Sequence, residues 1–265
     1  MSSYGNLFKS AEDQKGMTPK WLLRRLEQKF NKGKQMFDPC PRNWNIKKHG
    51  DGLQIKWKNV NYVNPPFDNT GAFFNKAIIE AKQKKLSVFL VPTRFHTRFF
   101  QNNIEHMKHI SIFTKNVAFE GYDKPLPCCL CLVIFGPYRS PSNKYLHFAN
   151  VPSPATLNQV KSMLLAVYNK SEIAMLNHSI SEPIQKCLGN KKAIYCPARL
   201  DNRVIQEKVL PIVKDIIFLS PCLRRTAKDD KFMNGSMILI FHSNSPLLKH
   251  EFVNPRKVPY NMFGV

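Results

Sequence analysis

The chain has 265 residues, of which 43% are hydrophobic and 11% aromatic, and its 40 Lys and Arg outweigh 18 Asp and Glu to give a net charge of +22. This apolar content excludes an intrinsically disordered chain. No apolar run approaches the ~18–20 residues of a membrane-spanning helix, and the first residues lack the apolar core of a signal peptide, so we expect an intracellular protein with no membrane span.

The positive charge predicts a polyanionic partner. Both halves of the chain carry an excess of Lys and Arg, so no single tail explains the total. Such an excess concentrates polyanions near the protein and speeds their association. Nucleic acid is therefore the expected partner. The alternatives are charge that serves solubility, or a basic protein that is packed into a large nucleoprotein assembly.

The seven cysteines do not indicate a disulfide framework or a zinc site, because their number is odd and no CxxC pair is repeated. Cys128, Cys129 and Cys131 cluster within an apolar run. Successive residues of a strand face opposite sides, so only Cys129 and Cys131 would share a face. We expect a buried strand here and no metal site.

The first third of the chain predicts a helix followed by an irregular segment. Thr18 is the expected N-cap and Pro19 the first-turn residue of the helix. Its apolar positions recur at helical spacing, at Leu22, Leu23, Leu26 and Phe30. Pro39 and Pro41 end any strand that precedes them, and residues 42–52 are polar and typical of a loop.

The next segments predict a strand, a helix and a second strand. Residues 60–63 form a short apolar strand, Asn69 is placed to cap a helix over 70–85, and residues 86–91 form a continuous apolar strand. This order is typical of a right-handed βαβ unit and indicates an α/β fold. A helix at about 95–105 and strands at 110–114 and 128–135 complete this half.

The pattern restarts after residue 154. Residues 136–154 are rich in Pro, Ser and Asn and predict a linker. A helix over about 155–169 and strands at 173–176, 193–196 and 237–241 then follow in an order like that of the first half. We therefore expect two domains, at 1–143 and 151–265.

A direct shift supports this internal similarity. When residues 90–113 are offset by 105 positions, six of the 24 ungapped pairs are identical, where about one or two are expected by chance. The identical pairs are Pro92 and Pro197, Arg94 and Arg199, Arg98 and Arg203, Gln101 and Gln206, Ile112 and Ile217, and Phe113 and Phe218. We expect a diverged tandem duplication, the alternative being coincidence between two αβ segments.

The tetrapeptide Asn64-Pro65-Pro66-Phe67 follows the strand at 60–63 and carries the clearest chemical signal. The exocyclic N6 of adenine is a poor nucleophile because its lone pair is delocalised into the ring. Two acceptors, the Asn64 side-chain oxygen and the Pro65 carbonyl, would stabilise the positive charge that grows on N6 during methyl transfer. The prolines hold the turn rigid, and Phe67 offers a face on which a base can stack. The alternative is a Pro-Pro turn that merely ends a strand.

The chain resembles the phage-type DNA N-6-adenine methyltransferases over residues 17–137. The resembling segments occur in the family's order: 18–19 with the Leu-rich helix, 37–41, 51–53 with Trp57, 62–67, 91–94, 97–100, Phe119 and 132–137. The resemblance implies a Rossmann-like class I methyltransferase fold that uses S-adenosylmethionine to methylate N6 of adenine in duplex DNA, with the target adenine flipped out.

The same resemblance assigns roles to individual residues. Asn64, Pro65, Pro66 and Phe67 would be catalytic, and Thr18, Pro19, Asp38 and Pro39 would bind the cofactor. It also places the protein in the cytoplasm or nucleus of a host cell, or packaged in a virion. The second half would be a degenerate, non-catalytic copy, because the tetrapeptide does not recur there.

Two further observations shape the hypotheses. Arg94 and Arg98 lie four residues apart near the end of a strand, where they would share a helical face and bind DNA phosphates, or instead form structural ion pairs. No Gly-rich loop follows Asp38, and Phe67 stands where the family more often has Tyr. The runner-up hypothesis is therefore a catalytically inactive protein derived from a methyltransferase, such as a minor virion component or a nucleic-acid-binding protein. A third is a methyltransferase that acts on RNA or protein.

Overall fold

The computed structural model describes residues 16–42, 46–122, 124–125, 128–150, 156–176, 181–200, 202–220, 235–242, 244–249 and 256–264. The chain forms two compact units. Unit 1 holds the described residues of Met1–Thr93 and His106–Arg139, and unit 2 holds those of Arg94–Glu105 and Ser140–Gly264. Within these described stretches, no helix is both long and apolar enough to cross a membrane.

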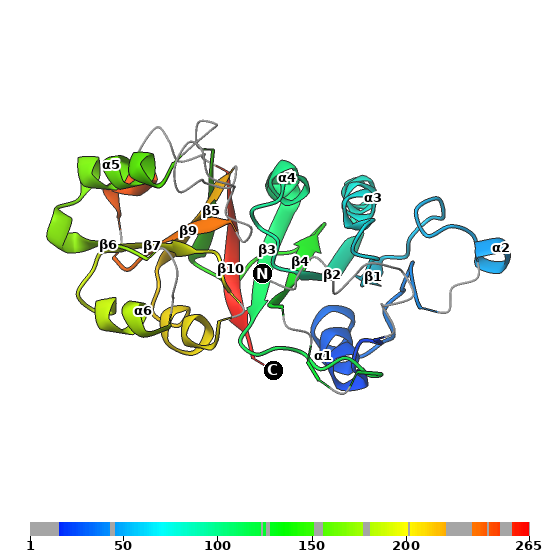
Figure 1. Cartoon of the computed structure of the whole chain (residues 1–265). Helices are drawn as coiled ribbons and strands as arrows, with labels where there is room; N and C mark the ends of the chain where they lie inside the picture. Colours follow the sequence, from blue (N-terminus) through cyan, green and yellow to red (C-terminus); the bar gives the residue numbers. More distant parts are fainter. Residues whose placement is uncertain are drawn as a thin grey trace. The chain divides into compact units, whose positions relative to one another are not determined.

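Unit 1 is a mixed α/β layer structure, as the alternation of strand and helix predicts. Its strands are β1 (Val60–Val63), β2 (Leu86–Pro92), β3 (Met107–Phe113) and β4 (Leu130–Phe135), and they lie side by side in the order β1-β2-β4-β3. Helices α1 (Lys20–Asn31) and α3 (Thr70–Lys82) cover opposite faces of β1 and β2 (Figure 1). Because β1 and β2 are parallel and β4 is antiparallel to both β2 and β3, strands β1, β2 and β3 end at the same edge.

The core of unit 1 is aromatic. Phe89 of β2 packs against Phe74 of α3 and Phe135 of β4, with ring centroids 5.0 and 5.4 Å apart. Trp57 closes this cluster at 6.4 Å from Phe89. Every residue of β2 and β4 is buried, which explains their continuous apolar runs, and Cys131 of β4 is fully buried as expected.

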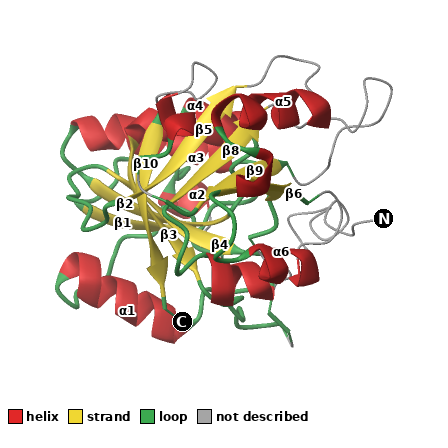
Figure 2. Ribbon diagram, turned by 90° about the vertical axis from the view of Figure 1, so that its left-hand side faces the viewer, coloured by secondary structure: helices red, strands yellow, loops and turns green. Residues whose placement is uncertain are grey.

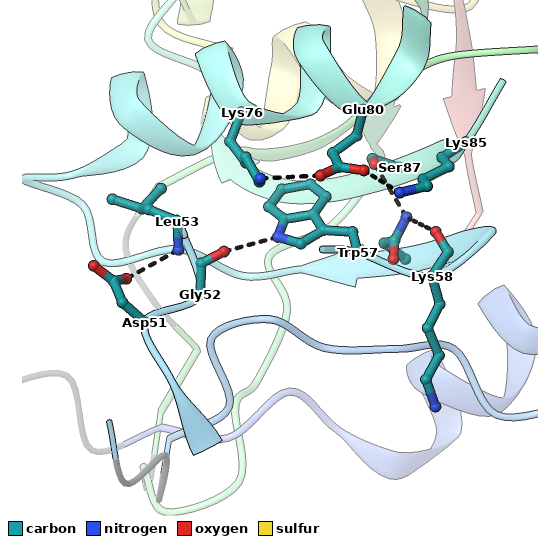
Figure 3. Close-up of polar contacts among 10 residues, drawn as sticks. Asp51, Gly52, Leu53, Trp57, Lys58, Lys76, Glu80, Lys85 and Ser87 are labelled. Atoms are coloured by element: carbon teal, nitrogen blue, oxygen red, sulfur yellow. Dashed lines mark hydrogen bonds and ion pairs between the residues drawn. The ribbon is translucent and has the colours of Figure 1, made fainter. Parts of the chain in front are cut away.

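A buried group of charges joins α3 to β2. Glu80 near the end of α3 accepts a 3.0 Å ion-pair contact from Lys76 and a second one from Lys85, which precedes β2 (Figure 3). Glu80 and Lys85 are 2% and 5% exposed. Burial raises the pKa of Glu80, but the hydrogen bonds from Lys85 and Lys76 lower it by more, so the pKa lies below its usual value of 4.5. The two charges thus fix the turn that starts β2.

In unit 2 the strands lie in the order β10-β5-β8-β9-β7-β6. Its strands are β5 (Lys144–Asn150), β6 (Ile173–Met175), β7 (Ala193–Pro197), β8 (Asp215–Ser220), β9 (Ser236–Ile240) and β10 (Lys257–Phe263). Helices α5 (Leu157–Val167) and α6 (Ser181–Cys187) lie on opposite sides of β6, β7 and β9 (Figure 1), and Figure 2 shows them on opposite sides of β6 and β9.

The segment 94–105 belongs to unit 2, although it follows β2 in the chain. It contains α4 (Arg98–Asn102), and Phe95 before this helix is fully buried against Phe218 of β8, with ring centroids 4.9 Å apart. The remaining helices are short: α2 (Ile46–His49), η3 (Ile104–His106), η4 (Lys170–Glu172), the π-helical η5 (Ile205–Val209) and η6 (Pro246–Lys249).

Two sequence expectations are wrong. The expected linker at 136–154 contains β5, which pairs with β8 on one side and β10 on the other. Of the Pro, Ser and Asn residues that suggested a linker, those at 137–143 precede this strand and Asn150 ends it, whereas 152–154 lie outside the described residues. The expected loop at 42–52 contains the short helix α2. Strand β10 and helix α6 were not expected, because neither has a distinctive apolar period.

The two units share a four-strand pattern. The order β6-β7-β9-β8 repeats β1-β2-β4-β3, with one parallel pair followed by two antiparallel pairs. Pro92 ends β2 and Pro197 ends β7, the positions that the shift of 105 pairs. The strands that the sequence comparison equates thus lie in equivalent positions within their own units.

We expect Glu80→Gln to lower the free energy of unfolding by about 3–5 kcal/mol, because it leaves Lys85 buried without its counter-charge. The matched control is Glu207→Gln, which removes an exposed i,i+4 pair with Arg203 and should cost less than about 1 kcal/mol. Urea denaturation measures both.

The pH dependence of the free energy of unfolding provides a second test of Glu80→Gln. A depressed pKa in the folded state means that Glu80 stabilises the protein above pH 4.5 and that this contribution is lost as the pH falls below it. Glu80→Gln should therefore flatten the acid side of the stability curve. If Glu80→Gln and Glu207→Gln lower the free energy of unfolding equally, the buried pair of Glu80 and Lys85 does not contribute more than an exposed pair.

Candidate functional site

The site begins with a parallel pairing at the edge of unit 1. The segment around Phe37 runs alongside β1 as an isolated parallel bridge to Asn61. The Phe37 amide donates to the Val60 carbonyl at 3.1 Å, and the Tyr62 amide donates to the Phe37 carbonyl at 2.8 Å. Both segments therefore end at the same edge. The parallel register places Asp38 level with Tyr62 and Cys40 level with Asn64, whose backbone N–H contacts the Cys40 thiol.

A cavity of about 850 Å³ opens at this edge, within the size range of small-molecule sites. Residues from four stretches of unit 1 line it: 16–23, 38–53, 62–73 and 119–122. The chemically significant members are Thr18, Lys20, Asp38, Pro39, Arg42, Asp51, Gly52, Tyr62, Asn64, Pro65, Pro66, Phe67, Phe119, Glu120 and Tyr122. Acidic, aromatic and amide groups are thus brought to one hollow.

The tetrapeptide 64–67 forms a tight turn from β1 into α3. The Pro66 carbonyl accepts a 3.0 Å hydrogen bond from the Asn69 amide and a 3.2 Å bond from the Thr70 hydroxyl, which also donates to the Phe67 carbonyl at 3.3 Å. Among the described residues, no backbone or side-chain donor is bonded to the Pro65 carbonyl. Neither proline has an N–H, so the β1 ladder stops at Asn64.

A chain of hydrogen bonds fixes the Asn64 side chain. Its amide nitrogen donates to the Thr18 hydroxyl at 3.3 Å, and this hydroxyl lies 2.6 Å from that of Tyr62. Burial raises the pKa of Tyr62 well above its usual value of 10.0, so the phenol stays neutral. Because the nitrogen of an amide is turned toward Thr18, the Asn64 oxygen faces away from it and remains an acceptor.

Thr18 therefore does not have the capping role that the sequence predicts. The N-cap of α1 is Pro19, whose side chain makes no capping hydrogen bond. Instead, the Glu120 carboxylate accepts a 3.0 Å hydrogen bond from the Lys20 amide, where a negative charge also complements the helix dipole. Met17 and Glu120 exchange two backbone hydrogen bonds of 2.8 and 2.9 Å, which hold the start of α1 beside the cavity.

Asp38 and Cys40 form a buried polar pair in the turn beside Asn64. The Cys40 amide donates to the Asp38 carboxylate at 2.9 Å. Burial raises the pKa of Asp38 to about 6, against a smaller lowering by this hydrogen bond. Burial and the nearby Asp38 charge also raise the pKa of the Cys40 thiol, which contacts the backbone N–H of Asn64. A cation in the cavity would favour the ionised form of Asp38.

Gly52 brings a second segment against this turn. A Cβ at Gly52 would lie 2.0 Å from the Pro39 carbonyl oxygen, so the close approach requires glycine. The buried Trp57 indole donates to the Gly52 carbonyl at 2.8 Å, and the Asp51 carboxylate accepts from the Leu53 amide at 2.9 Å (Figure 3). Asp51 is thereby held at the cavity wall, facing the stretch that carries Asp38.

The structure brings most of the expected site residues together. The cavity is lined by Thr18, Asp38, Pro39 and residues 64–67. Pro19, which follows Thr18 in the chain, is buried. Arg94 and Arg98 lie before and at the start of α4, in the segment assigned to unit 2.

Sequence reasoning missed Asp51, Gly52, Tyr62 and Glu120 as lining residues. The resemblance marks residues 51–53, but their polar surroundings favoured a plain loop. The sequence around Glu120 gives no sign that its side chain binds the first amide of a helix that begins 100 residues earlier.

The chain is similar in sequence to a known protein family. The family model described as "DNA N-6-adenine-methyltransferase (Dam)" matches residues 5–151, which is more than half of the chain. Among curated proteins, none matches the chain.

We expect Gly52→Ala to lower the free energy of unfolding by about 1–3 kcal/mol, because its Cβ overlaps the Pro39 carbonyl and the two segments must separate. Gly189→Ala is the control. Its Cβ meets nothing within 4 Å, so it bears only the strain of a φ of +83°, about 1–2 kcal/mol.

Thermal unfolding compares the two, and a crystal structure of Gly52→Ala should show the segments around residues 39 and 52 moved apart. Unchanged stability together with an unmoved Pro39 would contradict the close packing.

Proposed function

The chain belongs to the DNA N-6-adenine-methyltransferase family, and from this premise we propose that it transfers a methyl group from S-adenosylmethionine to N6 of adenine in DNA. The observation that carries the proposal is the Asn64 amide, which is held by Thr18 at a cavity that also contains Asp38. The expected Rossmann-like class I fold of the family belongs to the same proposal.

Asn64 and Pro65 supply the two acceptors that the reaction needs. N6 becomes nucleophilic when its lone pair leaves conjugation with the ring, and positive charge then grows on the nitrogen. The Asn64 side-chain oxygen and the Pro65 carbonyl accept its two N–H groups and stabilise that charge in the transition state. The N6–methyl bond forms as the sulfur–methyl bond breaks, and N6 then loses a proton to solvent.

The turn positions the base as well as the acceptors. Pro65 and Pro66 fix the backbone, and Thr70 holds it from α3 through two carbonyls, so the acceptors do not reorganise during the reaction. Phe67 lines the cavity and offers a flat face on which adenine can stack. Phe provides this stacking face as well as Tyr does. An adenine within a duplex reaches this site only after it is flipped out.

The cavity fits S-adenosylmethionine, which supplies the electrophilic sulfonium methyl when bound. Asp38 and Asp51 provide carboxylates for its cationic groups and ribose hydroxyls, and Phe119 and Tyr122 provide apolar surface for its adenine ring. The contact of Gly52 with Pro39 takes the place of a Gly-rich loop, since it brings two backbone segments together at the cavity wall. In this proposal Thr18 and Pro19 close the cavity from α1.

We also propose that unit 2 is a diverged copy of unit 1 without a reaction of its own. The shared strand pattern and the six identities at a shift of 105 support the duplication. Strand β6 occupies the position of β1, yet its residues Ile173, Ala174 and Met175 lead into Leu176, with no Asn-Pro-Pro-aromatic sequence. The rigid acceptor pair is therefore missing from this unit.

We expect Asn64→Ala to lower kcat for methyl transfer by at least about 100-fold, because one of the two acceptors is lost. Transfer of labelled methyl groups to adenine-containing DNA, with mass spectrometry of N6-methyladenine, measures the effect. Calorimetry should give an affinity for S-adenosylmethionine close to that of the unchanged protein.

Asp68→Ala is the matched control, since Asp68 is exposed in the same turn and should be neutral. Full activity of Asn64→Ala would refute the catalytic assignment. If the unchanged protein does not bind the cofactor, the chain is an inactive member of its family. Methylation of RNA in place of DNA would reassign the substrate.

We expect Thr18→Val to lower kcat by about 10-fold, because the isosteric side chain cannot hold the Asn64 amide and a net hydrogen bond is worth about 0.5–1.5 kcal/mol. Thr18→Ser restores the hydroxyl and should recover most of the rate. The 1H–15N resonance of the Asn64 side-chain amide should shift in Thr18→Val and return in Thr18→Ser. An unchanged resonance and rate in Thr18→Val would show that this hydrogen bond does not position Asn64.

A further inference from the structure

Exposed apolar side chains gather at the mouth of the cavity. Met17 and Ile46 line the cavity and are 45% and 63% exposed. Trp21, the second residue of α1, follows the lining residue Lys20 and is 44% exposed. Unit 1 has one other large apolar side chain among the described residues that is comparably exposed, Ile79 of α3. Such a cluster around a pocket marks an interaction surface.

The same mouth is strongly basic. Lys20 and Arg42 line the cavity and are exposed. Arg24 follows Lys20 by one helical turn and is also exposed. The described residues of 16–25 and 42–49 contain six Lys and Arg and no Asp or Glu. Asp38, Asp51 and Glu120 line the cavity, but each of these carboxylates already accepts a hydrogen bond from a backbone amide.

These two properties together match one kind of partner. A polyanion is attracted by the cations, but a phosphate backbone alone gives exposed Met, Trp and Ile side chains nothing to cover. DNA from which a base has been extruded presents both a charged and an apolar surface. Its phosphates stay charged, and the bases next to the extruded one expose apolar faces, which stacking or wedging side chains cover. A flexible Met and a flat Trp are suited to such faces.

We propose that the mouth rim, defined as Met17, Lys20, Trp21, Arg24, Arg42 and Ile46, is the surface of unit 1 that docks DNA around the flipped adenine. Lys20, Arg24 and Arg42 bind the phosphates that flank the target nucleotide. Met17, Trp21 and Ile46 cover the apolar faces of the bases on either side of the extruded adenine. The proposal rests on the proposed function and assigns to these residues the DNA contact that the sequence suggested for Arg94 and Arg98.

The test is the salt dependence of DNA binding, measured by fluorescence anisotropy with a labelled duplex and the full-length protein between ~50 and ~200 mM salt. Lys20→Glu/Arg42→Glu should reduce the slope of log K against log salt by about 1.8, as expected for the loss of two phosphate contacts. Affinity at the lowest salt should fall more than about 10-fold.

Lys82→Glu/Lys108→Glu is the matched control. It makes the same change in net charge at two exposed positions of unit 1, just before β2 and at the start of β3, on the sheet edge opposite the cavity. It should leave the slope unchanged. If both double variants reduce the slope equally, DNA senses only the overall field and the mouth rim is not the docking surface.

A neutral variant tests the apolar half of the proposal. Trp21→Ala should weaken binding several-fold more to a duplex with an abasic site opposite the target adenine than to a fully paired duplex, at an unchanged salt slope. Equal weakening for both duplexes, or none, would overturn the stacking role. Melting temperatures of all variants confirm that they are folded.

These outcomes are separable from those of the proposed function, because anisotropy requires no methyl transfer. If the mouth rim binds DNA but the protein transfers no methyl group, only the proposed function is wrong. If the protein is active but the rim variants bind DNA normally, only the assignment of the mouth rim is wrong.

Discussion

The site depends on the parallel pairing of Phe37 with β1. Two backbone hydrogen bonds, of 3.1 and 2.8 Å, place this short segment beside the strand, and parallel neighbours end at the same edge. As a result, Asp38 and Asn64 line the same cavity although 25 residues separate them. If the segment paired in the opposite direction, the carboxylate and the amide would lie at opposite edges of the sheet. The cavity, its acid and its amide thus follow from the direction of one bridge.

The start of α1 shows how the site uses groups that would otherwise stabilise a helix. A Thr at the N-cap typically contributes about 1 kcal/mol, but the Thr18 hydroxyl is bonded to Asn64 and Tyr62. Glu120 partly offsets this loss, since it caps Lys20 from another part of the chain. Met17 and Glu120 then hold the segment in place through paired backbone bonds. The helix is positioned by tertiary contacts, which are the contacts that orient the amide.

What the sequence could predict depended on the range of the interactions involved. The strand 60–63, the proline turn and the helix from residue 70 follow from local patterns, and the structure confirms all three. Gly52 is different, because its need for glycine arises from a carbonyl 13 residues earlier that only the fold brings near. Strand β5 was mistaken for a linker because its pairing with β8 and β10 is entirely non-local. Thr18 looked like a cap because its true partner is 46 residues away.

In the proposed duplication, the contrast between β1 and β6 explains how unit 2 keeps the strand pattern without the proposed chemistry. At the end of β6, the Leu176 amide still donates to the Tyr195 carbonyl at 2.9 Å, so the ladder continues past the strand. At the end of β1, Pro65 and Pro66 have no N–H to donate, and the ladder must stop. Ending the ladder turns the backbone away from β2 and leaves the Pro65 carbonyl outside the pairing. A residue with an N–H at that position would favour continued pairing, which stabilises the sheet but removes an acceptor that points away from it.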